Sequence, residues 1–210
     1  YAQKQVKMYE GPIEALESIR GYLKKQNEKY VIMTDSNVAV NFDFNDLLHA
    51  HMASGADATV VYRKQEIPDS LIRQSTETVD MYYALGINGD HVSKIYVNPT
   101  EKGKMNFCLN IYVMERERLI RMIDDAYVHG YTNFVRDILE RQIEHLDVRG
   151  YCYDGYVAQI HDMKSYFEEN MKLLQEENLN ALFSENQIYT KIRDDNPTRY
   201  INGSKAKNIM

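Results

Sequence analysis

Short apolar runs alternate with helical patterns along the chain. The run Tyr30–Met33 has polar neighbours and follows Gly11–Asn27, where apolar residues recur at helical spacing. An uninterrupted apolar run of this length is typical of a strand that is buried on both faces of a parallel sheet. We predict similar strands at Ala58–Tyr62, Cys108–Val113 and Val148–Tyr153. The pattern therefore predicts an α/β fold with a mostly parallel sheet, helices on both faces, and Tyr30–Met33, Ala58–Tyr62 and Cys108–Val113 as central strands.

Two further helices and a hairpin complete this part of the chain. Asp43 is placed to cap a helix over Asn45–Ser54, and Glu115–Tyr127 has a charged outer face. Asn88-Gly89-Asp90 separates two β-prone runs, Tyr82–Ile87 and Val92–Val97, which indicates a β-hairpin. The polar segment Arg63–Asp80 is interpreted as a surface loop, either a lid over a pocket or a solvated linker.

A last helix is expected after Asp162, which is placed as its N-cap. Its apolar stripe has helical spacing, and we interpret that stripe as core packing. The stripe consists of Tyr166, Phe167, Met171 and Leu174.

Composition narrows the class of protein. The 210 residues carry a net charge of −6 and a sequence pI near 5.6, which argues against nucleic acid or an anionic membrane as partner. No apolar stretch is long enough to span a bilayer. Cys108 and Cys152 have no metal or redox spacing, so we expect a cytoplasmic location.

The candidate chemistry lies directly after the first predicted strand. Thr34, Asp35, Ser36 and Asn37 follow Met33, and ligands gather at the carboxyl ends of strands in open α/β sheets. A plain strand–loop–helix turn explains the same residues. His49 and His51 lie two apart on a helix and face different directions, so they cannot share a metal ion. Cys108, in an apolar strand, is interpreted as an inert core thiol.

The stretch Tyr30–Phe44, which reads Y-V-I-M-T-D-S-N-V-A-V-N-F-D-F, resembles the sugar nucleotidyltransferases, in particular bacterial glucose-1-phosphate adenylyltransferase. The family's Gly-Asp-His falls on Ser36, Asn37 and Val38, so Asn37 replaces a metal-binding aspartate. That pattern is similar to the non-catalytic sister subunit of glycogen synthesis, the GlgD type. The resemblance implies a Rossmann-like fold of the nucleotide-diphospho-sugar transferase type.

The resemblance also implies a domain organisation. Residues 1–187 would be a nucleotidyltransferase-like domain that lacks its N-terminal part. The missing part would contain the first strand and the Gly-rich phosphate loop. Residues 188–210 would be a connector into a left-handed β-helix that is absent here. The connector holds three cations that could receive a small phosphorylated effector, or pair locally with acidic neighbours: Lys191, Arg193 and Arg199.

Other motifs of the family are matched in part. Where the family has Phe-x-Glu-Lys-Pro, whose Glu and Lys hold the sugar phosphate, this chain has Val97 and Asn98 before its proline. The segment Cys108–Val113 resembles the family's Ser-Met-Gly-Ile-Tyr-Val, in which the glycine packs under the glucose. Asn110 occupies the position of that glycine. Arg136 and Asp137 match Lys-Asp of a further motif, and could serve a site or hold two elements together.

The second metal-site strand of the family reads Glu-Gly-Tyr-Trp-Arg-Asp-Val. This chain has Asp154 and Gly155 at its start, Ala158 in place of the arginine, and Gln159 in place of the aspartate. Nucleotidyl transfer needs Mg²⁺, which prefers carboxylate oxygens. Because Asn37 and Gln159 offer neutral amides, the resemblance implies a site with no catalytic residues, no metal and no cofactor, although active members of the family use Mg²⁺.

Three hypotheses follow. The first is a regulatory, catalytically impaired partner of a catalytic glucose-1-phosphate adenylyltransferase subunit, in a heterotetramer. The second is a working nucleotidyltransferase that uses Asp35 or Asp154 as metal ligand. The third is a stand-alone module that binds a nucleotide sugar or a sugar phosphate. The residues expected at the substrate pocket are Asp35, Ser36, Asn110, Arg136, Asp137, Asp154 and Gly155.

Overall fold

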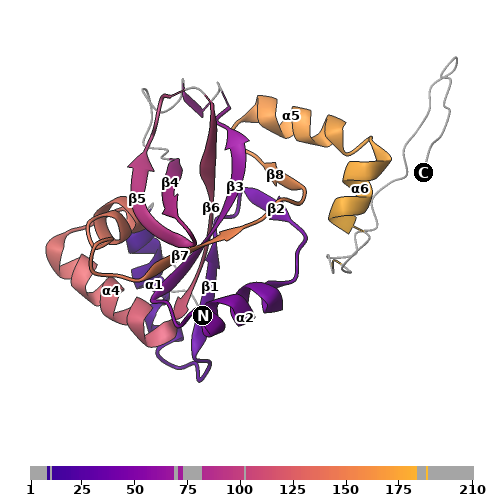
Figure 1. The fold of residues 1–210 in the computed structure, drawn as a ribbon. Helices are drawn as coiled ribbons and strands as arrows, with labels where there is room; N and C mark the ends of the chain where they lie inside the picture. The colour runs from indigo at the N-terminus through magenta and orange to yellow at the C-terminus, as the bar shows by residue number, and fades with distance from the viewer. Residues whose placement is uncertain are drawn as a thin grey trace, which may run out of the picture.

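The computed structural model describes residues 9, 11–68, 71–72, 82–101, 103–183 and 188. It contains both helices and strands (Figure 1). The elements are α1 (Pro12–Leu23), β1 (Tyr30–Thr34), β2 (Val38–Val40), α2 (Phe44–Ser54), β3 (Ala58–Glu66), β4 (Tyr83–Asn88), β5 (His91–Val97), β6 (Lys104–Glu115), α4 (Arg116–His129), the π-helix η1 (Val135–Glu140), β7 (Val148–Cys152), β8 (Val157–Gln159), α5 (Met163–Lys172) and α6 (Glu176–Phe183). Four of these strands, β3 to β6, lie between α2 and α4 in the chain.

The main sheet is mixed, so the prediction of a mostly parallel sheet is wrong. Its strand order is β1-β6-β3-β7-β5-β4, and β6 also pairs with β4 at one position. β6 runs antiparallel to both β1 and β3, and the one parallel pair among the described strands is β3–β7. The apolar runs Ala58–Tyr62 and Cys108–Val113 are largely buried, whereas β1 contains no buried residue and Ile32 is 39% exposed, so the burial on both faces predicted for Tyr30–Met33 is wrong. Even where burial was predicted correctly, it carries no information about the direction of the neighbouring strand.

Two of the three strands expected at the centre lie there. β3 has β6 on one side and β7 on the other, and β6 has β1 and β3 as neighbours. The prediction that Tyr30–Met33 is central is wrong for the part of the chain described, because β1 pairs with β6 alone. β3 also extends to Glu66, so the prediction of a surface loop is wrong for Arg63–Glu66, and residues 69–70 and 73–80 of that predicted loop lie outside the described residues.

The hairpin prediction is confirmed. β4 and β5 pair antiparallel from Tyr83↔Val97 to Asn88↔His91. Gly89 between them has φ of +67°, a conformation that glycine adopts without steric cost. At the open end, the backbone N–H of Asn98 donates to the Tyr82 carbonyl at 2.9 Å, and the Tyr82 N–H donates to the Asn98 side chain at 2.9 Å. Asn98 thereby closes the hairpin.

Two hydrophobic clusters cover opposite faces of the sheet. Along β6 the side chains alternate between them: Tyr112 and Met114 join one cluster, while Leu109, Ile111 and Val113 join the other. The first cluster includes residues of α1 and α4, and the second includes Leu47 of α2. Helices therefore cover both faces, as predicted. The carboxylate of Asp124 in α4 pairs with Arg20 of α1 and joins the two helices of the first layer.

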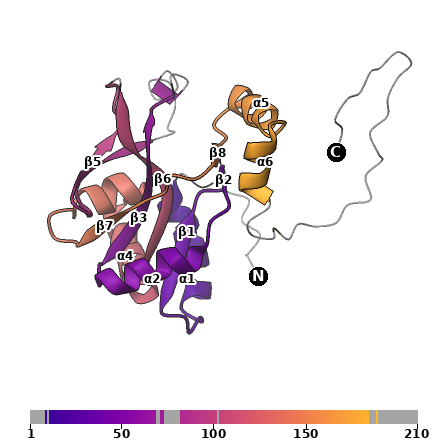
Figure 2. The ribbon, with the colours of Figure 1, turned by 45° about the vertical axis from the view of Figure 1, so that its right-hand side comes forward.

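The described strands also form a second sheet of two strands. β2 and β8 pair antiparallel, and α5 and α6 follow β8 on the side away from α4 (Figures 1 and 2). The Asn41 side chain donates to the Leu182 carbonyl at 2.7 Å, which joins the residue after β2 to α6.

The cap predicted for α5 is confirmed, but its predicted core packing is wrong. Asp162 and Ser165 form a reciprocal capping box. No residue of α5 is buried, and the exposed fractions of Phe167 and Leu174 are 63% and 76%. Tyr166 and Met171 are also exposed. Helical spacing identifies an apolar face, but it does not show whether another part of the chain covers that face.

Within the described ranges, the helices are all too short or too polar to cross a bilayer. The three cations proposed for an effector, Lys191, Arg193 and Arg199, lie outside the described residues.

Candidate functional site

Two pockets meet at the carboxyl end of β1. The large pocket has a volume of about 490 Å³ and lies beside the start of α1. The small pocket has a volume of about 170 Å³ and reaches β8. Asp35 and Asn110 are the residues that both linings share. The loop after β1, where candidate chemistry was expected, thus borders a cavity on each side.

Asn110 owes its position to an irregularity in β6. Val61 of β3 pairs with Ile111, but the next residue, Tyr62, pairs with Cys108, so Leu109 and Asn110 have no partner in β3. This bulge holds Asn110 at a φ of +54°, which is uncommon for a residue with a side chain.

The Asn110 amide is hydrogen-bonded on both sides. Its Nδ2 donates to Oδ2 of Asp35 at 2.6 Å, and its Oδ1 accepts from the Tyr112 hydroxyl at 2.9 Å. Burial raises the pKa of the Asp35 carboxyl above its ordinary value, and the bond from Asn110 opposes that shift. The Asp35 carboxylate is therefore held in place between the two pockets.

Asn37 and Gln159 line the small pocket together. Asn37 lies in the turn after β1, and Gln159 is the last residue of β8. The two segments are joined through the β2–β8 pair, in which Val38 is opposite Gln159, and by the Ile160 N–H, which donates to the Asn37 carbonyl at 2.9 Å. Oδ1 of Asn37 is buried and has no hydrogen-bond partner among the described residues.

The large pocket is built where α1 meets the segment before η1. The Ile13 N–H donates to the Thr132 carbonyl at 3.2 Å, and a Cβ added to Gly11 would lie 2.4 Å from that oxygen. Only glycine therefore permits this approach. On the far wall the Tyr83 hydroxyl donates to Oδ1 of Asn133 at 3.0 Å.

Arg136 lines the large pocket, whereas Asp137 does not. Asp137 is buried, and both of its oxygens accept from the Arg136 guanidinium, at 2.6 and 2.9 Å. It also accepts the backbone N–H groups of Thr132 and Asn133. The guanidinium first, and then these N–H donors, hold the pKa of the Asp137 carboxyl well below its ordinary value. The structure thus favours a positioning role for Asp137, which orders the turn before η1.

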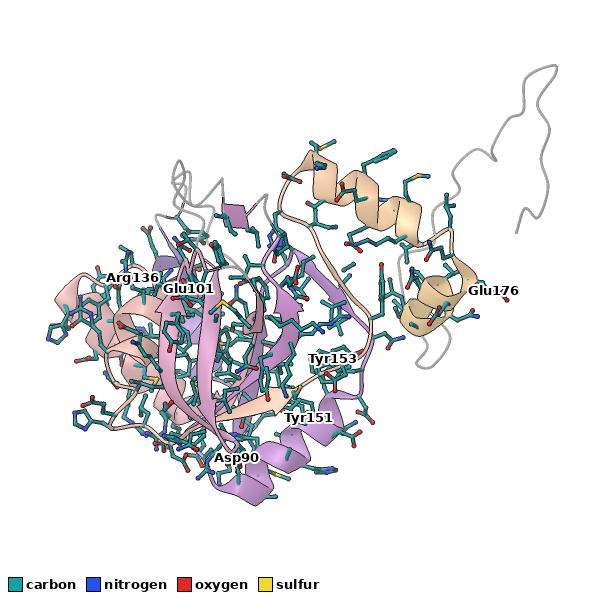
Figure 3. All side chains as sticks on the ribbon, turned by 45° about the horizontal axis from the view of Figure 1, so that its top comes forward. Asp90, Glu101, Arg136, Tyr151, Tyr153 and Glu176 are labelled. Atoms are coloured by element: carbon teal, nitrogen blue, oxygen red, sulfur yellow. The ribbon has the colours of Figure 1, made fainter. Side chains whose placement is uncertain are left out.

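Several expected residues lie outside both pocket linings. Ser36 is exposed in the turn after β1, and Asp154 and Gly155 are exposed between β7 and β8. In Figure 3, Arg136 lies on the side of α4, whereas Tyr153, the residue before Asp154, lies on the opposite side of the sheet. Val97 and Asn98 end the β4–β5 hairpin and line neither pocket.

The thiol of Cys108 lines the small pocket but is poorly suited to nucleophilic chemistry. Burial raises its pKa to about 11, so it is protonated at neutral pH. Its Sγ lies 3.4 Å from the Tyr112 hydroxyl. The interpretation as an inert core thiol agrees with this environment.

Sequence reasoning missed His161 and Tyr82 in the small pocket, and Tyr83 and Asn133 in the large one. His161 had a local signal, because it lies only two residues after Gln159, the last residue of β8. The other three come from segments that are distant in the chain, and no local pattern joins them to Asp35.

The residues of the small pocket do not fit Mg²⁺. Its described lining offers two amides where the resemblance places carboxylates, and its one carboxylate, Asp35, is bonded to Asn110. A hard cation of this kind prefers charged oxygen ligands. Across the part of the chain that the structure describes, no three His, Cys, Asp or Glu side chains gather as metal ligands would.

Comparison with known proteins gives a consistent set of relatives. A glucose-1-phosphate adenylyltransferase from Geobacillus stearothermophilus is 25% identical over 200 residues, which is 93% of this chain and 49% of the relative. The glycogen biosynthesis protein GlgD of Bacillus subtilis is 23% identical over 190 residues, which is 90% of this chain and 43% of the relative. A glucose-1-phosphate adenylyltransferase from Thermosipho africanus is 24% identical over 215 residues, which is 100% of this chain and 50% of the relative.

These relatives confirm the resemblance to glucose-1-phosphate adenylyltransferase and to GlgD, and the chain spans about half of their length. No family model matches the chain. Among solved structures, HddC from Yersinia pseudotuberculosis is similar in fold, with a TM-score of 0.58 and 16% sequence identity over 80% of this chain and 64% of that one. At that identity the likeness concerns the fold alone.

Proposed function

We propose that this protein is a catalytically impaired relative of glucose-1-phosphate adenylyltransferase that acts in glycogen synthesis as the cytoplasmic partner of a catalytic subunit. The names of the relatives support the pathway, since they include both the adenylyltransferase and a glycogen biosynthesis protein. The observation that carries the impaired activity is the small pocket, where Asn37 and Gln159 lie together at the two positions for which the resemblance implies metal-binding carboxylates.

A working nucleotidyltransferase is the second candidate, and Asp35 is the observation that favours it. Asp35 lines the small pocket, so it could replace one of the lost ligands. Asp154, the other substitute considered, lines neither pocket. One carboxylate, already hydrogen-bonded to Asn110, is a poor replacement for two charged ligands beside a triphosphate. We therefore favour the impaired partner. A heterotetramer and an effector at Lys191, Arg193 and Arg199 stay predictions.

Kinetics with a catalytic subunit test the proposal. ADP-glucose formation is measured with Mg²⁺, ATP and glucose 1-phosphate for this protein alone, for the catalytic adenylyltransferase of the same source alone, and for their mixture. We expect the protein alone to form no product above the blank. The mixture should co-elute in size-exclusion chromatography, and it should show a higher rate or a changed effector response.

Serum albumin at the same concentration controls for a general effect of added protein. Product formation by this protein alone would overturn the impaired-subunit proposal in favour of Asp35-dependent catalysis. Separate elution together with unchanged kinetics would overturn the partnership.

A further inference from the structure

Most polar side chains in the described lining of the small pocket are neutral. Its described lining contains three carboxamides, Asn37, Asn110 and Gln159, and one imidazole, His161. We propose that this pocket binds an uncharged sugar in preference to a sugar phosphate. The inference rests on the proposed non-catalytic role of the same pocket, and it names the class of ligand that the pocket takes.

The charge of the lining disfavours an anion. The described lining holds no lysine or arginine, and its one carboxylate is Asp35. A phosphate group placed there would meet a like charge with no cation to offset it. Arg136, the cation of the large pocket, already pairs with Asp137 and does not line the small one.

The hydrogen-bonding groups suit hydroxyls. Each carboxamide offers N–H donors and a carbonyl acceptor, and a sugar hydroxyl can both donate and accept, so it can pair with either end. Oδ1 of Asn37 is buried without a partner among the described residues, and a buried acceptor of this kind is destabilising until it is paired. A ligand hydroxyl would satisfy it.

Size and shape point to one small ring. At roughly 30 Å³ for each water in the liquid, the volume of about 170 Å³ corresponds to on the order of six waters. That space suits a monosaccharide better than a nucleotide. Tyr82 and Phe107, whose rings stack with centroids 6.3 Å apart, add an apolar part to the lining that can contact the C–H groups of a sugar.

The chain holds this lining in place before any ligand binds. The bulge in β6 directs Asn110 toward the pocket, and its bond to Asp35 fixes both side chains. The β2–β8 pair fixes the backbone on either side of Asn37 and Gln159. Preorganised polar groups lose less side-chain entropy when a ligand binds.

Direct binding of two probes tests the preference. Glucose and glucose 1-phosphate are titrated separately into the protein at pH 8, without ATP or catalytic subunit, and followed by saturation-transfer NMR. We expect glucose to bind at least tenfold more tightly than glucose 1-phosphate. Tighter binding of the phosphate, or no binding of glucose, would overturn the inference.

Two variants change the charge of the pocket in the same direction. Asp35→Asn removes the carboxylate with little change in shape, and Gln159→Lys adds a cation. Both should narrow the preference for glucose, and Gln159→Lys should improve glucose 1-phosphate binding about tenfold. Gln175→Lys adds the same charge at an exposed position between α5 and α6, and should leave the ratio unchanged.

Circular dichroism establishes that each variant is folded. If Gln159→Lys does not fold, Asp35→Asn decides by itself. An equal response to Gln159→Lys and Gln175→Lys, or no change in the ratio with Asp35→Asn, would place the probes outside the small pocket and overturn the inference. Because the test measures neither product formation nor assembly, its failure is distinguishable from failure of the proposed function.

Discussion

Asp137 and Asn110 are polar residues that hydrogen bonds hold in defined positions. Asp137 keeps its charge because a guanidinium and two backbone N–H groups satisfy its oxygens. Asn110 instead stays in a left-handed conformation, and its amide joins Asp35 to Tyr112. In both cases the hydrogen bonds compensate for an environment that the residue type does not favour.

Replacement of Asp137 by Asn should lower the free energy of unfolding by about 2–3 kcal/mol at pH 7, because charge-assisted bonds to a buried carboxylate are lost. The folded-state pKa of Asp137 is lowered, so its contribution is present above the ordinary carboxyl pKa near 3.8 and is lost as the pH falls further. Urea unfolding from pH 7 to pH 3 should therefore show a flatter acid dependence for the variant.

Asp125→Asn is the matched control, since Asp125 is exposed on α4. It should change stability by less than about 0.5 kcal/mol at pH 7. Equal effects of the two substitutions would show that Asp137 does not act through its buried hydrogen bonds.

α5 has a complete capping box at its N-terminus, and its apolar face is exposed to solvent. Its capping box satisfies backbone N–H groups at the first turn. Since no residue of the helix is buried, little tertiary packing supports it. Short helices without such packing are marginal in water, so we expect the cap to decide how much of α5 is formed.

The substitution Asp162→Ala should destabilise α5 locally by about 1 kcal/mol, because the Ser165 N–H loses its acceptor. Hydrogen exchange should accelerate at the backbone amides of α5 and leave those of β3 and β6 unchanged. Lys164→Ala, at an exposed position of the same helix, is the control. A loss of protection spread over the main sheet would contradict the local effect.

The whole molecule is organised by β6, which contributes side chains to both hydrophobic clusters. Tyr112 and Met114 pack on the face of α1 and α4, and Leu109 and Ile111 pack on the other face. The same strand has β3 along one edge and pairs with β1 and β4 on the other. A destabilising substitution in β6 should therefore lower the free energy of global unfolding rather than promote local opening.

Leu109→Ala should lower the free energy of unfolding by about 2–5 kcal/mol, because truncation of a fully buried leucine removes apolar contact and leaves a cavity. Thermal or urea unfolding measures the change. Leu174→Ala is the matched control, since Leu174 is 76% exposed, and it should have little effect. Similar losses in the two variants would mean that burial of the Leu109 side chain does not account for its effect.

The sequence by itself determined most of the local structure of this protein. The strands at Ala58–Tyr62 and Cys108–Val113, the hairpin around Gly89 and the caps Asp43 and Asp162 all lie where the pattern predicted. Each follows from the conformational preferences of a few neighbouring residues, or from the periodicity of apolar positions. The resemblance to glucose-1-phosphate adenylyltransferase was also carried by short motifs, and the relatives confirm it.

Only the tertiary structure decided which of these elements meet. Strand direction in the main sheet depends on long-range pairing, and apolar spacing in α5 did not show that its face is uncovered. The pockets likewise join Asp35 to Asn110, which is 75 residues away, while Asp154 and Ser36 stay outside. Contacts between distant segments arise from the packing of the whole chain, because no local preference of either segment specifies its partner.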